Sequence, residues 1–600
     1  MPAIRRPIRA VGLLAALGGA CAAPAGSPPA AVPASGTPAA RMTQLADEIW
    51  RVVLDDNPTY GTFLGLPGAR HDRLNDNSLA AAQRQDSLTD AWLERLGQIP
   101  AESLTGRPEA VTYGDVRELL EAGRQSRVCR QELMPLSQLS GWQNAFAYLA
   151  QIQPVGTPEA RAAALARWRR IPAYLDTEIA NLREGVRLGY TVPKGNVRVI
   201  LEQLDQLLAA PAAASPLAAP ARRDSTPEFR AEMLQVVERE INPAIRRYRD
   251  YLAGSYLPAA RETIAVGALP NGAACYRALV RTYVTLDLEP RAIHQLGLEQ
   301  MRRIEDEMGV IERRTFHTAD VHGLLQRLRT DSQYTFRTRE EMVDVATRAI
   351  ARAKAAAPRW FGRTPTADMI VDPCQTFEEK SGCPGSYVPA AEDGGHPARY
   401  RINLRDPTHQ PRATAEATAF HEGIPGHHFQ LSLARERPEA HPLTRFVPLS
   451  GFSEGWGLYA EQLAEEMGLY SSDLDRMGRL SNDALRAARL VVDPGMHVLG
   501  WSREQAIEYM AAHTAESRQA IESEVDRYII SPGQATAYMV GRLEIERLRQ
   551  EAERRLGRAF DIRAFHDRVL ENGSVPLPLL RENVERWIAD GGGGGPAVAQ

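Results

Sequence analysis

The spacing of apolar residues predicts helix along most of the 600-residue chain. Segments rich in Ala, Leu, Arg and Glu carry apolar residues at helical intervals. These predicted helices cover residues 41–53, 79–97, 157–185, 226–253, 286–314 and 338–355, and helical signals resume from 413 to about 590. By contrast, residues 209–222 are low in complexity and predict a surface loop. The pattern as a whole predicts a mainly α protein.

A different pattern occupies residues 363–412, where Pro, Gly and Asp are frequent and helical periods are few. Residues 399–404 alternate in a strand-like way, so we expect a small β element near 385–405. No firm domain boundary stands out, although soft ones could fall near 225 or 360. We therefore expect one large helical domain over 41–590, followed by a Gly-rich disordered tail at 591–600.

The N-terminus has the pattern of an export signal. A basic region precedes an apolar run at residues 10–17 that is too short to span a bilayer. We assign residues 1–21 to a signal peptide, because Cys21 after small residues resembles the lipidation site of bacterial lipoproteins. Simple cleavage one or two residues later is the alternative. Residues 22–40 then form a flexible tether, which places the protein in the periplasm or envelope with the lipid as its membrane contact.

Charge and cysteine content narrow the function classes further. The formal net charge of −4 gives no electrostatic footprint for nucleic acid. Four cysteines follow Cys21, and an even number in an exported protein suggests disulfides. Cys374 and Cys383 could close a short loop, and Cys129 and Cys275 are the other two; four separate thiols are the alternative.

The most unusual segment has three histidines and a glutamate within eight residues: His421, Glu422, His427 and His428. Two imidazoles can hold a divalent metal, and an adjacent carboxylate can accept a proton from an activated water. On a regular helix a spacing of six turns the second imidazole away, and a spacing of seven separates the two by roughly 10 Å. Pro425 and two glycines must therefore distort the helix for both imidazoles to reach one ion. Either His427 or His428 could be the second ligand.

A second segment offers a carboxylate. Zinc hydrolases with two His ligands and one Glu ligand take the Glu from the next helix, and Glu454 lies 27 residues after His427. Its neighbours Phe452 and Trp456 make a solvated position less favourable. Glu461 lies seven residues further on the same helical face, and there we expect an ordinary solvated acidic surface.

A third segment offers groups that could act on a substrate. A hydrolase of this kind needs a donor for the developing oxyanion, and His497 and Tyr538 are candidates. Arg489 or Arg542 could bind a substrate carboxylate with two hydrogen bonds. A core tyrosine and an arginine in a surface ion pair are the ordinary alternatives.

Together, these motifs resemble the bacterial domain-of-unknown-function 885 family, many members of which are described as candidate lipoproteins. The resemblance rests on residues 421–430, on Glu454-Gly455-Trp456 and on residues 532–535, and it extends to 285–298. The family is similar to the mostly helical zincin-type peptidases such as carboxypeptidase Taq, neurolysin and angiotensin-converting enzyme. This resemblance implies a helical zincin-like body with a deep cleft.

By the same resemblance His421, His427 and Glu454 would bind Zn²⁺, and Glu422 would be the general base. The Gly-His pair at 426–427 lines up with the Gly-His of the shorter zincin motif, which favours His427 over His428. The chain departs from the shorter motif by two inserted residues, one of them Pro425.

The resulting hypothesis is an exported zinc-dependent peptidase that acts on peptides. We expect the peptide substrate to lie along an edge strand at residues 399–404. We expect cleavage to be carboxypeptidase-like. One alternative is a metal-dependent hydrolase of another amide or of an ester. The other is a non-catalytic, metal-binding envelope lipoprotein. Another first-row metal could replace zinc.

Overall fold

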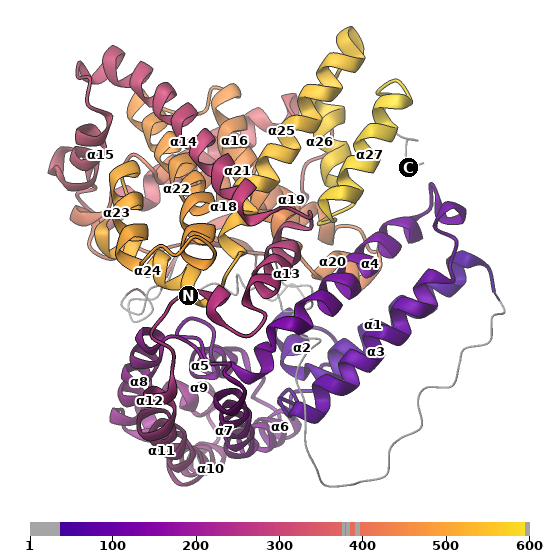
Figure 1. Ribbon diagram of the computed structural model, residues 1–600, viewed down its shortest axis with the longest axis vertical. Coiled ribbons are helices and arrows are strands. Elements are labelled where there is room, and N and C mark those ends of the chain that lie inside the picture. Colours follow the sequence, from indigo (N-terminus) through magenta and orange to yellow (C-terminus); the bar gives the residue numbers. More distant parts are fainter. Residues whose placement is uncertain (1–35, 375–378, 380–384, 391–396, 594–600) are drawn as a thin grey trace. The chain divides into compact units, whose positions relative to one another are not determined.

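A computed structural model describes residues 36–374, 379, 385–390 and 397–593 (Figure 1). The predicted signal peptide, Cys21, most of the tether and the end of the tail lie outside these residues. The described chain is mainly helical, as predicted, and none of its helices is long and apolar enough to cross a bilayer. It forms two compact units: unit 1 contains residues 106–118 and 276–593, and unit 2 contains 36–105 and 119–275. Neither boundary falls near 225 or 360.

Unit 2 is built from short and medium helices. They are α1 (Pro38–Asp56), α2 (Pro58–Leu64), α3 (Leu79–Gly97), α5 (Trp142–Ile152), α6 (Pro158–Trp168), α7 (Ile171–Leu188), α8 (Lys194–Ala209), α9 (Ala219–Arg223), α10 (Pro227–Val236), α11 (Asn242–Tyr251) and α12 (Leu257–Ala259). Two further helices, α4 (Pro108–Ser126) and α13 (Gly272–Val284), run across the boundaries between the units. The predicted helix at 157–185 is divided into α6 and α7, with Pro172 in the first turn of α7.

The surface loop predicted at residues 209–222 is wrong for its second half, because residues 209–214 are exposed or half-buried whereas residues 217–221 are buried. This segment forms short helical turns, and Leu217 and Ala218 are completely buried. Trp168 donates its indole N–H to the carbonyl of Leu217 at 2.8 Å. The small side chains of residues 218–221 therefore fit a tightly packed interior.

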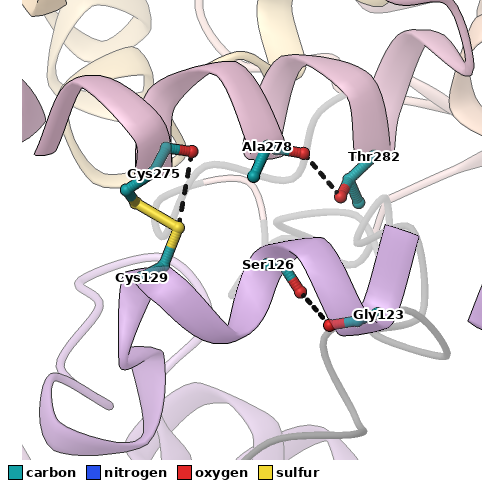
Figure 2. The surroundings of a disulfide bond; sticks show 6 residues. All are labelled: Gly123, Ser126, Cys129, Cys275, Ala278 and Thr282. Carbon is teal, nitrogen blue, oxygen red and sulfur yellow. Dashed lines mark hydrogen bonds between the residues drawn. A yellow bond between two sulfur atoms is a disulfide. The ribbon is translucent and has the colours of Figure 1, made fainter. Parts of the chain in front are cut away.

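Unit 2 contains a disulfide between Cys129 and Cys275 (Figure 2). Cys129 ends a short helical turn that follows α4, and Cys275 lies in the first turn of α13. The two cysteines are 146 residues apart in sequence. Cys383, the predicted partner of Cys374, lies outside the described residues, so that pairing stays a prediction.

Unit 1 contains the longest helices and the candidate site. Its helices are α14 (Pro290–Ile311), α15 (Val321–Thr330), α16 (Arg339–Ala356), α18 (Ala415–Glu422), α19 (His427–Arg435), α20 (Pro442–Phe446), α21 (Ser450–Glu466), α22 (Asp473–His497), α23 (Arg503–His513), α24 (Arg518–Ile530), α25 (Ala537–Leu556), α26 (Ile562–Leu570) and α27 (Leu577–Ala589). The most extensive helix pairs are α14 with α22 and α21 with α25. The backbones of α21 and α25 approach so closely that a Cβ on Gly541 would lie 1.8 Å from the carbonyl oxygen of Gly451. With α18, α19 and α22 also in contact with it, α21 is buried over its first fourteen residues except Gln462.

The small sheet of unit 1 has the strand order β1-β3-β2, where β1 is Met369–Pro373, β2 is Ser386–Val388 and β3 is Ala398–Ile402. The predicted β element is thus confirmed, with β1 as an addition. The predicted edge strand at 399–404 is wrong, because β3 pairs with β1 on one side and with β2 on the other. Among the described strands, the edges belong to β1 and β2.

We expect removal of the disulfide to destabilise unit 2. Closing a loop of 146 residues restricts the unfolded chain by about 5 kcal/mol in a chain-entropy estimate, and measured losses are roughly 2–5 kcal/mol. The Cys129→Ala/Cys275→Ala double variant should therefore unfold at a lower urea concentration than the wild type. Limited proteolysis read by mass spectrometry should place the first cuts in residues 36–105 or 119–275. An unchanged urea midpoint would contradict this expectation.

Candidate metal centre

The helix that carries the histidines is interrupted, as the sequence predicts. α18 ends at Glu422 and α19 begins at His427, and the Ile424–Pro425 peptide bond between them is cis. The amide of Gly426 donates to the carbonyl of Phe420 at 3.0 Å, which folds the break into a tight turn. A Cβ on Gly426 would lie 2.0 Å from the carbonyl oxygen of His421, so this position requires glycine.

The break brings three predicted ligands together: His421, His427 and Glu454, with ligand atoms all within 4.8 Å of one another. Nε2 of each histidine lies 3.6 Å from Oε2 of Glu454. Ligand atoms about 2.0–2.1 Å from a tetrahedral zinc ion are separated by roughly 3.4 Å. The two His–Glu distances are therefore almost those that one ion requires, and the two histidine ligand atoms lie within 4.8 Å of each other. The three side chains are also buried, with exposed fractions of 1%, 6% and 7%.

The imidazole of His421 lies along one face of α21. Its Nε2 faces Glu454, and its Nδ1 lies 2.7 Å from Oε1 of Glu461. Gly457 stands between the two carboxylates on the same helical face, and a Cβ there would lie 2.7 Å from ring atoms of His421. The Glu–Gly–Glu spacing of three and four residues therefore forms a slot for one imidazole.

Glu461 is fully buried and fixes the tautomer of His421. Its carboxylate accepts hydrogen bonds from Nδ1 of His421 and from the amide of Asn482, and it lies 3.6 Å from the guanidinium of Arg486. Burial alone would raise the pKa of Glu461, but Arg486 and His421 outweigh burial and lower it. The carboxylate therefore stays ionised and accepts the proton that His421 carries on Nδ1, so Nε2 is the nitrogen directed at Glu454. The solvated surface predicted for Glu461 is wrong.

A hydrogen bond to its Nδ1 also orients His427. Its Nδ1 lies 3.3 Å from the amide oxygen of Gln430, and the amide nitrogen of Gln430 donates to Ser453 at 2.8 Å. With the amide of Gln430 in this orientation, its oxygen accepts from Nδ1 of His427, which therefore carries the proton. Nε2 is again the nitrogen directed at Glu454. The two imidazole rings are almost perpendicular, with centroids 4.8 Å apart.

Glu422, the predicted base, is buried beside these groups. Its Oε2 accepts the backbone N–H of Tyr387 at 2.8 Å, which ties the last residue of α18 to strand β2. Burial and the nearby Glu422 carboxylate raise the pKa of Tyr400 on the neighbouring strand β3. The strand that contacts the predicted base is thus β2.

His428 is placed apart from the three ligands. Its Nδ1 lies 3.1 Å from the hydroxyl of Tyr387 and 3.3 Å from that of Ser432. Burial lowers the pKa of His428 to about 4, so the ring is neutral near pH 7. Of the two candidates left open by the sequence, His427 is the one that meets His421 and Glu454.

The predicted oxyanion donors occupy different surroundings. Nε2 of His497 lies 3.1 Å from the carbonyl oxygen of Tyr528, and its ring packs against Tyr276. Tyr538 lies in the first turn of α25, and the guanidinium carbon of Arg486 is 6.0 Å from its ring centre. Since Arg486 also pairs with Glu461, Tyr538 is the candidate that contacts the surroundings of His421. The donor role of either residue stays a prediction.

The two arginines predicted to bind a substrate carboxylate differ in how many of their guanidinium nitrogens already donate within the protein. Nitrogens of Arg542 donate to Glu546 and Asp483, both at 2.6 Å, and to Gln462. All three nitrogens of its guanidinium therefore have internal acceptors, which argues against a substrate role.

Arg489 donates to Tyr528 and Glu524 and lies 4.4 Å from the centre of the Tyr538 ring. Its Nη1 is buried and makes no hydrogen bond to a described residue. Of the two arginines, Arg489 is the one that keeps a donor for a substrate carboxylate.

The donor set fits a zinc ion. Nε2 of His421 is buried and has no hydrogen-bond partner among the described residues. Burial opposes the charged form of this imidazole, but Glu454 and Glu461 outweigh burial and raise the pKa of His421. A buried site that favours positive charge, and that offers two imidazole nitrogens and one carboxylate, has the ligand types and number of a catalytic zinc site.

A mainly helical fold with a buried His–His–Glu set defines a class of candidate metalloproteins. Within this class, the chain belongs to the bacterial family of proteins of unknown function DUF885, whose model matches residues 58–584. No curated protein matches the chain.

Two solved structures are similar in fold. One is described as a "putative lipoprotein" from Colwellia psychrerythraea; it has a TM-score of 0.85 and 25% identity, and the match covers 92% of this chain and 100% of that one. The other, a "putative lipoprotein of unknown function" from Shewanella oneidensis, has a TM-score of 0.73 and 19% identity, and the match covers 91% and 99%.

Sequence reasoning missed the residues that hold the ligands. Glu461 and Gly457 share a face with Glu454, and the spacing of three and seven residues was a signal for them. Gln430 and Tyr387 gave no such signal, since their roles depend on which atoms face the histidines.

We expect Glu461→Gln to weaken zinc binding by about 10–100-fold, because an amide orients and polarises His421 less strongly than a carboxylate. Titration of metal-free protein against a chromophoric chelator measures this. Glu466→Gln is the matched control: Glu466 lies on the same helix but is exposed and paired with Arg549, so affinity should not change. Equal affinities for both variants would refute the orienting role.

We also expect Gly457→Ala to weaken zinc binding by at least about tenfold, since the added methyl group displaces the imidazole of His421. The backbone itself should tolerate alanine, which favours helix by about 1 kcal/mol over glycine. Gly195→Ala is the control, because a Cβ there meets open space within α8. The same chelator titration applies. Wild-type affinity in Gly457→Ala would show that the slot is not needed.

Proposed function

We propose that this protein is an exported, zinc-dependent metallopeptidase. The observation that supports the proposal most strongly is the convergence of Nε2 of His421, Nε2 of His427 and Oε2 of Glu454, with the carboxylate of Glu422 next to His421 in the chain. When bound, zinc would supply a Lewis acid that polarises a carbonyl and lowers the pKa of a water molecule.

Glu422 is the residue that would move the proton. It would accept a proton from the attacking water and deliver it to the leaving amine nitrogen. The backbone N–H of Tyr387 holds one of its carboxylate oxygens and so orients the group. Glu461 and Gln430 would keep both ligand imidazoles in the tautomer that the reaction needs, without contacting the substrate.

The surroundings also support a substrate orientation. Because β2 provides the backbone N–H beside Glu422 and is an edge of the described sheet, we assign the extended substrate to β2 instead of β3. The buried, unsatisfied Nη1 of Arg489 supports a carboxypeptidase-like mode, in which it would bind the terminal carboxylate. A lipid on Cys21 would attach the enzyme to the envelope, in agreement with the description of the Colwellia protein.

The test is the Glu422→Gln variant. It should bind zinc as the wild type does, because Glu422 is not among the three ligands, yet turn over peptides about 10²–10⁴-fold more slowly. Zinc content by mass spectrometry and turnover of a peptide library measure the two quantities separately.

Glu416→Gln is the matched control, since Glu416 is also buried on α18 but is paired with Arg352. It should lose stability and keep its turnover per folded molecule. Wild-type turnover in Glu422→Gln would refute the mechanism.

The choice of substrate tests the carboxypeptidase-like mode and the two alternative functions. A carboxypeptidase-like enzyme should cleave peptides with a free C-terminus and leave C-terminally amidated copies intact, and Arg489→Met should remove this preference. Cleavage of simple amides or esters but of no peptide would favour the other hydrolase class. Bound zinc without turnover of any of these substrates would favour the non-catalytic lipoprotein.

A further inference from the structure

A second group of metal-binding side chains lies in unit 1, on three other helices. Glu305 of α14, His322 of α15 and His513 of α23 place one ligand atom each within 4.8 Å of the others. His322 is exposed, and the other two are half-buried. We propose that this group is a second, solvent-accessible site for a divalent first-row metal such as Zn²⁺.

A backbone carbonyl fixes the tautomer of His322. Its Nδ1 lies 2.6 Å from the backbone carbonyl oxygen of Ala512, to which it can only donate. The proton is therefore fixed on Nδ1, and Nε2 carries the lone pair. A carbonyl that holds one imidazole nitrogen while the other binds metal is the usual arrangement in protein metal sites.

His513 and Glu305 form the other side of the group. Nδ1 of His513 lies 2.5 Å from Oε1 of Glu305, so a single hydrogen-bonded proton joins the two side chains. A cation that binds both would take the place of this proton, and the proton would leave to solvent. Ring contacts hold His513 on two sides: its centroid lies 4.4 Å from that of Tyr509 and 5.4 Å from that of His322.

The backbone around the group also favours a cation. His513 is the last residue of α23, where helix carbonyls carry partial negative charge. α15 already meets this helix end, because Arg329 donates to the carbonyls of Ala511 and Thr514 at 3.0 and 2.8 Å. A metal bound at the first turn of α15 would add a second link between these helices. It would hold α14, α15 and α23 together at one point.

Two imidazoles and one carboxylate suit zinc better than calcium or magnesium, which prefer all-oxygen sites. Three protein ligands in an exposed position leave at least one coordination position to water. We therefore assign a stabilising role to this site: a reversibly bound metal would hold α14, α15 and α23 together. The site is separate from the buried centre at His421.

The test counts zinc equivalents. Metal-free protein, without its N-terminal signal, is equilibrated with zinc chloride and dialysed, and bound metal is measured by mass spectrometry. The wild type should hold two equivalents, His322→Ala one, His421→Ala one, and the double variant none. His317→Ala, which removes an exposed histidine just before α15, should keep two.

Thermal unfolding gives an independent readout. Zinc should raise the melting temperature of His421→Ala, where only the second site remains, and should leave that of the double variant unchanged. If His322→Ala binds as much zinc as the wild type, or if His421→Ala binds none, the second site is refuted. Loss of one equivalent in His421→Ala tests the buried centre separately, so the two sites can fail independently.

Discussion

The imidazole of His421 lies flat against α21, held between the carboxylates of Glu454 and Glu461 over the missing side chain of Gly457. This one contact fixes several features at once. It sets the rotation of α21, requires glycine at 457, and decides which nitrogen of His421 faces the other ligands. It also explains the break between α18 and α19, because a continuous helix would carry His427 away from the same carboxylate.

The contact has an electrostatic consequence for the whole of unit 1. Glu422, Glu454 and Glu461 are all buried, and buried carboxylates are costly unless charges or donors compensate them. Arg486 and Asn482 of α22 compensate Glu461, and the backbone of β2 compensates Glu422. A cation between the two imidazoles and Glu454 would complete this balance. The contacts that α22 and the small sheet make with the site are thus electrostatic as well as apolar.

Several expectations failed for a common reason. The sequence makes Glu461 and the alternating residues at 399–404 look like surface features, since acidic residues on helices and polar residues on strands are usually solvated. Glu461 is buried because α25 and α22 cover α21, and β3 is central because β1 pairs with it from a segment almost thirty residues upstream. Arg542 looked available to substrate until its carboxylate partners were placed.

The sequence by itself determined the mainly helical class, the break at Pro425, two of the three converging side chains, His421 and Glu454, and the presence of Glu422 beside them. These follow from local chemistry: helical periodicity, the effect of proline, and the residue types that bind metal. The tertiary structure alone decided His427 over His428, the orienting partners Glu461 and Gln430, the strand next to Glu422 and the second group at Glu305, His322 and His513. Each of these depends on which atoms of distant segments face one another, and helical or strand periodicity carries no information about that.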